Sequence, residues 1–347
     1  MIAVTFFDGE GWREGVVEAV DGGGMLLREE AVPTALPRLD GVITGGFTDH
    51  HVHLQLVDAT LLADSMLGRV VDLGGNPEVL ARLAVHNSAR TSQNDTSAAF
   101  SDQAAGVLAE SCTPPAAIEF AGAFLTPPGG YPSDREWAPA GSFREVATVE
   151  DAARAIAEMA DAGASRIKVA SNSDAGPVFD DELLRTIIEL AAGRDLPVVV
   201  HAQGPGEAQR AARLGAHALA HAPFTERLTD DEIAEQAASL SWISTLAIHD
   251  GPERATAIDN VGRFHAAGGT VLYGTDMGNG PTPVDVNPRE IEALREAGVD
   301  GVDLLRALAP ADPLDPASAL FVLPSTPDRT DADPLRARRL TPADLKV

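Results

Sequence analysis

The sequence of 347 residues contains one cysteine, Cys112, which excludes an intramolecular disulfide framework and fits a reducing compartment. No histidine lies near it in the sequence, so it is a poor candidate for a catalytic nucleophile. No uncharged stretch approaches the roughly 18 apolar residues that a membrane span needs. The first residues have neither the basic region nor the apolar run of a signal peptide. We therefore predict a soluble, cytoplasmic protein without a membrane partner.

Basic residues are few compared with acidic ones. The chain has 26 Lys and Arg against 52 Asp and Glu, a formal net charge of −26, and an isoelectric point near 4.5. This charge repels phosphate backbones, so we exclude nucleic acid as a partner and expect a small-molecule substrate. The acidity does not by itself indicate a cationic substrate, because net charge mainly governs solubility.

The remaining composition is globular, with 44% hydrophobic and 22% charged residues. Short apolar runs alternate with amphipathic segments of helical length, which predicts an α/β fold. The expected strands are Gly41–Thr48, Arg69–Leu73, Ala116–Ala121, Arg166–Ala170, Pro197–His201, Ala216–His221, Trp242–Leu246 and Thr270–Gly274. The expected helices include Val149–Ala162, Asp180–Ala192, Gly206–Leu214, Thr229–Ala237 and Ile258–Ala267.

Eight strands that alternate with helices predict a (β/α)8 TIM-like barrel, which we place at residues 41–317. The alternative is an open doubly wound sheet, but no Gly-x-Gly-x-x-Gly turn follows an early strand. Residues 1–40 contain short strands separated by Asp-Gly turns. With residues 318–347, whose C-terminal part looks reduced or irregular, they predict a small β-sandwich appendage.

The first predicted barrel strand ends in Asp49, His51 and His53, at a spacing of two residues. On an extended backbone these three side chains point to one face, and His50 points to the other. Two imidazoles so placed can bind one metal ion. Zinc, copper, iron and nickel all suit imidazole nitrogen, so the spacing does not choose among them.

Four more polar residues lie within or at the end of later strands: Lys168, His201, His221 and Asp276. One such residue alone is most often structural. Together with the His-x-His pair, four of them indicate an active site, because barrel enzymes place their sites at the C-terminal ends of the strands. We expect His217, four residues before His221, to be a packed histidine inside the barrel.

These segments resemble the amidohydrolase superfamily, in particular its imidazolonepropionase-like and prolidase-like branch. Three regions carry the resemblance. The segment 46–54 is similar to the signature of the first strand, 201–222 to the fifth and sixth strands, and 267–276 to the eighth strand. The resemblance covers about residues 41–317, and it implies a hydrolase that cleaves amide-type C–N bonds. Members of this superfamily are often homo-oligomers.

The resemblance also implies roles for single residues. His51, His53 and Asp276 would hold a buried metal ion, and His201 and His221 a second. Lys168 would bridge the two as N6-carboxylysine. The expected cofactors are two divalent cations, Zn²⁺ first, with Mn²⁺, Fe²⁺ or Ni²⁺ as alternatives. A hydroxide bridging them would attack the substrate, with Asp276 as the catalytic base and acid.

The sequence departs from its relatives after the third strand, where Tyr131 stands at a position that is histidine in several of them. Its phenol would donate to a developing oxyanion or line the pocket, and both readings stay open. His249, beyond the seventh strand, is a further candidate for contact with substrate. Alternative functions are a one-metal deaminase, an ester or lactone hydrolase, a decarboxylase, and a binding protein without activity.

Overall fold

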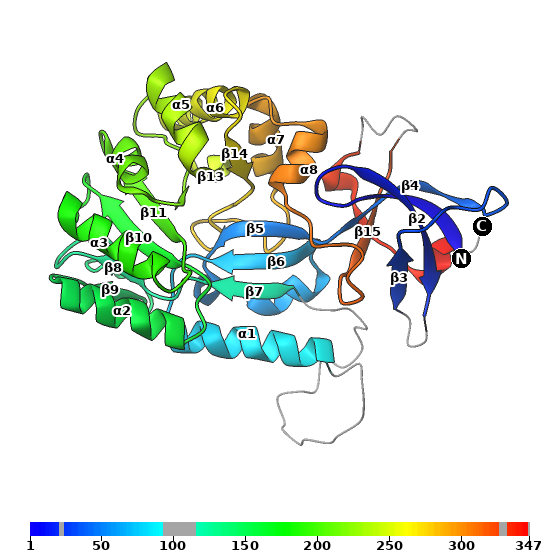
Figure 1. Ribbon diagram of the computed structural model, residues 1–347, viewed down its shortest axis with the longest axis horizontal. Helices are drawn as coiled ribbons and strands as arrows, with labels where there is room; N and C mark the ends of the chain where they lie inside the picture. The colour runs from blue at the N-terminus through cyan, green and yellow to red at the C-terminus, as the bar shows by residue number, and fades with distance from the viewer. Residues whose placement is uncertain (21–23, 93–115, 326–331, 346–347) are drawn as a thin grey trace.

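The computed structural model describes residues 1–20, 24–92, 116–325 and 332–345. Cys112 lies outside these residues. Parallel strands form the centre of the molecule, in a three-stranded sheet of order β5-β6-β7 and a seven-stranded sheet of order β14-β13-β12-β11-β10-β8-β9 (Figure 1). Their bounds are β5 Phe47–Val52, β6 Leu67–Asp72, β7 Ala117–Phe120, β8 Phe124–Thr126, β9 Phe143–Glu145, β10 Ile167–Asn172, β11 Val198–Gln203, β12 Ala218–Leu219, β13 Ser241–Ile243 and β14 Thr270–Leu272.

The two parallel sheets meet where the chain leaves β14. His50 of β5 donates its backbone N–H to the carbonyl of Tyr273 at 3.0 Å, and Val52 forms an isolated parallel bridge with Met277. The first central strand therefore lies beside the segment that follows the last one. The mixed α/β class with parallel strands is confirmed, whereas the closure of eight strands into one barrel stays a prediction.

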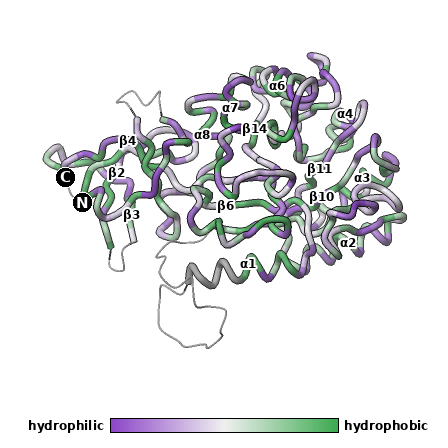
Figure 2. Tube along the Cα trace, turned by 180° about the vertical axis from the view of Figure 1, so that it is seen from behind, coloured by the Kyte–Doolittle hydropathy of each residue, from purple (hydrophilic) through white to green (hydrophobic). Residues whose placement is uncertain are grey.

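Helices follow most of the central strands and cover them. Side-chain caps fix where several begin: Thr148 and Thr229 each form a capping box with the acidic residue three positions on, and Asp180 accepts the N–H of Leu183 at 2.8 Å. The helices are α1 Pro77–Ser92, α2 Val149–Asp161, α3 Asp181–Ala192, α4 Glu207–Leu214, α5 Asp230–Ser239, α6 Gly251–Ala266, α7 Pro288–Glu296 and α8 Gly301–Ala307. In Figure 2 the central strand β6 is largely hydrophobic, while the outer helices alternate between hydrophilic and hydrophobic segments. This alternation is expected of helices with one buried face.

The two ends of the chain combine in a six-stranded sheet of order β16-β15-β4-β1-β2-β3. It has its own apolar cluster, which includes Phe6, Ile43 and Val322. Both termini lie at this end of the molecule (Figure 1). The strands are β1 Ile2–Phe7, β2 Trp12–Ala19, β3 Met25–Arg28, β4 Arg38–Gly45, β15 Leu320–Leu323 and β16 Arg338–Arg339. β15 joins this sheet by pairing with residues 42–45 of β4, and a β-sandwich appendage made of residues 1–40 and 318–347 stays a prediction.

The sequence did not predict β8 and β9, and its assignment of one further strand was wrong. The single strand predicted over Gly41–Thr48 is two strands, because β4 ends at Gly45 in the outer sheet and β5 begins at Phe47 in the central one. A Cβ on Gly45 would lie 2.0 Å from the carbonyl oxygen of Ala311. A Cβ on Gly46 would lie 2.6 Å from the Cα of Gly68. Only glycine permits so close an approach of two backbones, and here it lets the chain pass between the sheets.

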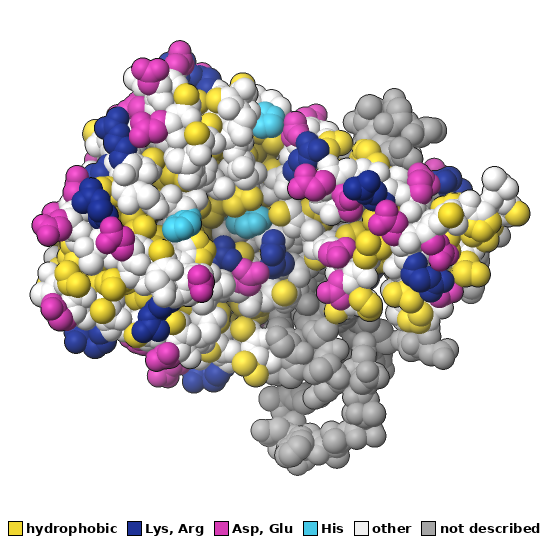
Figure 3. Space-filling view, viewed as in Figure 1, with side chains coloured by type: hydrophobic (Ala, Val, Ile, Leu, Met, Phe, Trp, Pro, Cys, Tyr) yellow, Lys and Arg dark blue, Asp and Glu magenta, His cyan; other side chains and the backbone are white. Residues whose placement is uncertain are grey.

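Charged side chains of both signs are interspersed over the face shown in Figure 3. Several arginines form ion pairs there or elsewhere on the surface, such as Arg144 with Glu158 at 2.6 Å and Arg254 with Glu296 at 2.7 Å. The net charge of −26 is therefore not gathered into one acidic patch on this face. Within the described residues, no helix is both long and apolar enough to cross a membrane.

Candidate metal centre

A cavity of about 980 Å³ opens at the C-terminal ends of the central strands. Every residue to which the sequence assigned a role in the site lines it. These are His51, His53, Tyr131, Lys168, His201, His221, His249 and Asp276. Residues up to 225 positions apart in the sequence thus meet in one place, as expected if the strand ends form a common site.

His51 on β5 and His53 just after it are both buried. Their Nδ1 atoms lie 2.8 Å from the carbonyl oxygen of Ala220 and 3.0 Å from that of Gly74. Such contacts fix the ring and the tautomer, with the proton on Nδ1 and the lone pair on Nε2. Each Nε2 is thereby available to a metal ion.

Asp276 follows β14 and lies at the centre of the group. Its Oδ1 is 3.3 Å from Nε2 of His51 and 3.1 Å from Nε2 of His53. Burial would raise the pKa of the Asp276 carboxyl, but His51 and His53 hold that pKa well below its ordinary value. Burial would likewise lower the pKa of His53, but its hydrogen bond to Asp276 raises that pKa. The backbone of Asp276 has a φ of 53°, a left-handed conformation that is uncommon outside glycine and typical of functional positions.

His201 on β11 and His221 after β12 form the other side of the group. Their rings meet edge to face with centroids 4.8 Å apart, and the ring of His221 lies 4.7 Å from that of His51. Nδ1 of His221 contacts the hydroxyl of Thr245 at 2.9 Å. Burial lowers the pKa of His201 to about 4 and that of His221 well below its ordinary value, so both imidazoles are neutral at pH 7 and able to bind a metal.

Lys168 on β10 is fully buried, and its Nζ has no hydrogen-bond partner among the residues that the structure describes. The nearest ring face belongs to Phe124, whose centroid is 5.8 Å away. Burial lowers the pKa of Lys168 to about 7. The sequence has only two lysines, Lys168 and Lys346, against many arginines. A buried amine without a partner costs free energy, so its presence in this cavity indicates a function.

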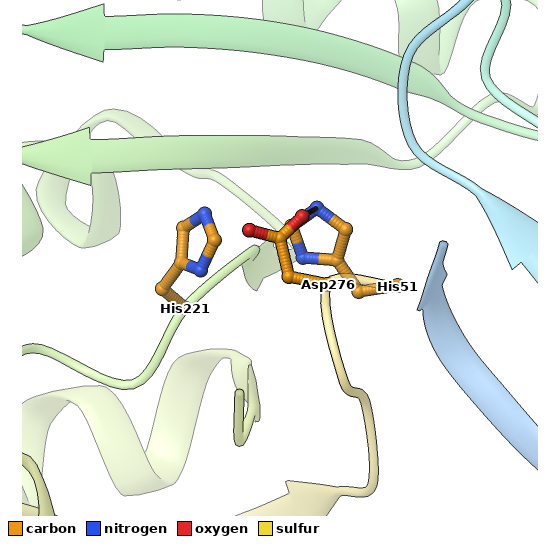
Figure 4. A group of neighbouring side chains, drawn as sticks. All are labelled: His51, His221 and Asp276. Carbon is orange, nitrogen blue, oxygen red and sulfur yellow. Dashed lines mark ion pairs between the residues drawn. The ribbon is translucent and has the colours of Figure 1, made fainter. Parts of the chain in front are cut away.

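The ligand atoms of His51, His221 and Asp276 all lie within 4.8 Å of one another, close enough to hold one metal ion. Figure 4 shows the carboxylate of Asp276 between the two imidazole rings. The resemblance placed His53 rather than His221 with His51 and Asp276. The structure brings all four side chains together, and how they divide between two ions stays a prediction.

Tyr131 and His249 also reach the cavity. The ring of Tyr131 stacks on that of His201 with centroids 5.3 Å apart, and burial raises the pKa of its hydroxyl to about 12. The ring of His249 packs on that of Phe224 with centroids 4.1 Å apart, and within the described part of the chain its buried Nε2 has no hydrogen-bond partner. Burial lowers the pKa of His249 to about 4, so this imidazole is neutral at pH 7.

Two other histidines lie outside the cavity. Nδ1 of His50 contacts the carbonyl of Tyr273 at 3.0 Å, away from the cavity. This agrees with the prediction that His50 points to the opposite face of the strand from His51 and His53. The prediction for His217 was wrong. This residue precedes the short strand β12, is exposed, and accepts the N–H of Val198 at 3.1 Å.

The sequence did not reveal several residues that shape the site. The Asp49 carboxylate accepts the N–H of His51. The Asp72 carboxylate accepts the N–H groups of Leu54, which follows His53, and of Gly74, whose carbonyl contacts the His53 ring. For Asp72, the sequence offered one signal, the pattern Asp-Leu-Gly-Gly that begins at this residue. Other cavity-lining residues were also missed, namely Trp137, Phe224 and Asp250 on loops, Glu253 on α6 and Arg289 on α7.

Comparison with solved structures places this geometry in a known fold. A. niger ochratoxinase has a TM-score of 0.68 at 15% identity, over 98% of this chain and 94% of that one. Phenylurea hydrolase B has a TM-score of 0.68 at 16% identity, over 99% and 96%. A Xaa-Pro dipeptidase with methionine bound in its active site has a TM-score of 0.64 at 16% identity, over 94% of each chain.

No family model and no curated sequence matches the chain. Other structures with this fold are an amidohydrolase (TM-score 0.64, 15% identity) and a bottromycin amidohydrolase (TM-score 0.63, 18% identity), so the resemblance inferred from the sequence agrees with the fold. The chain shares the fold of these structures, and its own cavity holds a group of side chains able to bind a metal.

Proposed function

We propose that the protein is a binuclear metal-dependent hydrolase that cleaves an amide-type C–N bond of a small molecule. The observation that carries this proposal is the convergence of four histidines, Asp276 and the unpartnered amine of Lys168 in one cavity. Structural neighbours that include a Xaa-Pro dipeptidase and phenylurea hydrolase B support the reaction class.

The side chains fit two divalent cations. Neutral imidazoles and an anionic carboxylate are ligands for Zn²⁺, and the backbone and hydroxyl contacts of His51, His53 and His221 hold these rings in place. Lys168 fits only after modification, because an ammonium repels cations. A carbamate on its Nζ would supply two anionic oxygens where the structure has an amine without a partner.

In this proposal His51, His53, Lys168, His201, His221 and Asp276 hold the cations. When bound, such cations supply Lewis acidity towards the substrate carbonyl and lower the pKa of water towards about 7. Asp276 is held as an anion, so its carboxylate accepts the proton of the attacking water and passes it to the leaving nitrogen. No side-chain nucleophile is required.

Tyr131 and His249 lie on the cavity wall and contact the substrate in this proposal. The phenol of Tyr131 stays protonated at pH 7 and is able to donate a hydrogen bond to the developing oxyanion. Nε2 of His249 is buried without a partner and offers the substrate one hydrogen bond.

A one-metal enzyme, such as a deaminase, is the alternative. The single group formed by His51, His221 and Asp276 favours it, because these three residues suffice for one cation with an open position. Lys168 distinguishes the two proposals. An unmodified amine beside one metal ion supports the one-metal enzyme, and a carbamate supports the binuclear one.

Further parts of the proposal concern the molecule as a whole. We propose that residues 41–317 form a closed (β/α)8 barrel and that residues 1–40 with 318–347 form a separate β domain. β4, which belongs to the outer sheet, ends at Gly45, five residues beyond the proposed boundary. A cytoplasmic location, homo-oligomers and the absence of a nucleic-acid or membrane partner stay predictions.

The test is a hydrolysis screen with added zinc or manganese. The panel comprises dipeptides, N-acyl amino acids, cyclic amides and lactones, and the controls are chelator-treated protein and the Asp276→Asn variant. We expect metal-dependent cleavage of at least one amide, which the variant loses. Full activity in Asp276→Asn, or lactone cleavage without any amide cleavage, contradicts the proposal.

A further inference from the structure

Two aromatic side chains form one wall of the cavity beside the candidate metal ligands. Tyr131 stacks on His201 with an interplanar angle of 27°. Trp137 lies next to Tyr131, with ring centroids 6.1 Å apart and ring planes inclined at 52° to each other. We call this pair the aromatic shelf. Through Tyr131 it connects directly to a residue of the proposed metal centre.

The exposure of Trp137 is unusual in this chain. Its side chain is 43% exposed, whereas Trp242 is fully buried and stacks on Phe264 at 3.9 Å. The sequence has only three tryptophans and two tyrosines, and one of each forms the shelf. An indole that lines a cavity and is exposed to water gains the free energy of apolar burial when a ligand covers it.

The charges of the cavity decide what kind of ligand fits. Apart from the proposed metal ligands, two carboxylates line it, those of Asp250 and Glu253. Besides Lys168, Arg289 is the basic residue of the lining, and its guanidinium lies 3.6 Å from the carboxylate of Asp250. The guanidinium of Arg135 also lies 5.7 Å from the centroid of the Tyr131 ring. Outside the proposed metal ligands the two signs of charge are thus nearly balanced, and the shelf itself is suited to an uncharged ring.

We propose that Tyr131 and Trp137 form a subsite for an uncharged, planar aromatic ring of the substrate. The favoured substrates are then neutral amides, carbamates or ureas that carry an aryl group. Stacking on the shelf would hold such a ring next to His201, with the C–N bond towards Asp276. The choice of bond rests on the proposed function, whereas the ring subsite is testable by binding alone.

The experiment compares two ligands of similar size, N-methyl-1-naphthamide and its fully saturated decahydro counterpart. Isothermal titration calorimetry measures both with the zinc-loaded full-length protein and its variants. The variants are Trp137→Ala, Trp137→Phe and, as a remote control, Trp12→Phe in the outer sheet. Trp12 packs on Phe7 at 5.4 Å and does not line the cavity.

We expect the naphthamide to bind more tightly than its saturated counterpart, by a factor of about two to ten in Kd. This factor corresponds to the usual interaction free energy of a pair of aromatic rings. Trp137→Ala should abolish this preference, Trp137→Phe should keep most of it, and Trp12→Phe should leave it unchanged. Equal affinity for both ligands, or an undiminished preference in Trp137→Ala, overturns the subsite.

Failure of the proposed function would look different. If the naphthamide binds with the expected preference and no amide, carbamate or urea is cleaved, the subsite stands and the hydrolase proposal fails. If amides are cleaved without any ring preference in affinity, the hydrolase stands and the subsite fails.

Discussion

The carboxylate of Asp49 is hydrogen-bonded to Thr275, although 226 residues separate them in the sequence. Oδ2 of Asp49 accepts the Thr275 hydroxyl at 2.6 Å, and Oδ1 accepts the Thr275 N–H at 3.1 Å and the His51 N–H at 3.0 Å. Both side chains are fully buried. Because Thr275 precedes Asp276, one carboxylate fixes the relative position of two proposed ligands, His51 and Asp276.

This relationship predicts the effect of removing the Thr275 hydroxyl. Thr275→Val should weaken zinc binding by about 10- to 100-fold, the usual cost of losing a group that orients metal ligands. Thr275→Ser keeps the hydroxyl and is the matched control. Competition with a fluorescent chelator measures the affinity, and circular dichroism verifies the fold. Equal affinities of the two variants would show that this hydroxyl does not position the site.

The lysine content makes the modification of Lys168 directly observable. Protein labelled at lysine Nζ with ¹⁵N and exposed to ¹³C-bicarbonate should give only two lysine ζ-nitrogen signals. We expect the signal of Lys168 to show coupling to a carbamate carbon when zinc is present. Lys346→Arg assigns the other signal. An uncoupled Lys168 amine in the zinc-loaded protein would rule out the bridging carbamate.

His249 is predicted to bind substrate without binding metal. Its unpartnered Nε2 can make one hydrogen bond, so His249→Ala should raise KM about five- to tenfold, the value of roughly one hydrogen bond. The metal content should not change. His265→Ala, on the outer helix α6, is the control and should leave KM as it is. Loss of metal in His249→Ala would contradict the assignment.

Glu290 is predicted to make stability depend on pH. Its buried carboxylate accepts the N–H groups of Leu246 and Ala247, and burial raises its pKa from 4.5 to about 7. The folded protein therefore holds a proton that the unfolded chain releases between these values. This contribution to stability is fully present below pH 4.5 and is lost as pH rises through about 7.

Glu290→Gln should flatten this dependence. The difference in free energy of unfolding between wild type and variant should change by up to about 3 kcal/mol between pH 4.5 and 8, at roughly 1.4 kcal/mol for each pKa unit. Urea unfolding across that range measures it. A difference that stays constant with pH would mean that Glu290 titrates at its ordinary pKa when folded.

The sequence predicted the parts of the molecule that repeat a local pattern. Amphipathic periods located α2, α3, α4 and α5 to within about two residues, since this signal acts over a few residues, but the start of α6 was missed by seven. The candidate ligands were found for a related reason. A polar residue such as Lys168 or His221, within or just beyond an apolar strand, is seldom there for packing alone, so its position indicates a function.

Other features depend on contacts between distant segments, which no local pattern encodes. The break between β4 and β5 is set by the approach of Gly45 to Ala311, so the sequence merged these strands. The contact of Asp49 with Thr275 and that of Glu290 with the backbone at Leu246 join separate parts of the chain. Trp137 lies on a loop whose course only the folded chain defines.

The most direct test of the binuclear centre is its metal stoichiometry. Wild-type protein saturated with zinc, freed of excess by gel filtration, is analysed by inductively coupled plasma mass spectrometry beside Asp276→Asn. The account predicts two zinc ions for each wild-type chain and fewer in the variant. One zinc ion per wild-type chain would support the one-metal alternative, and a wild-type chain that retains essentially no metal would contradict the metal-dependent mechanism.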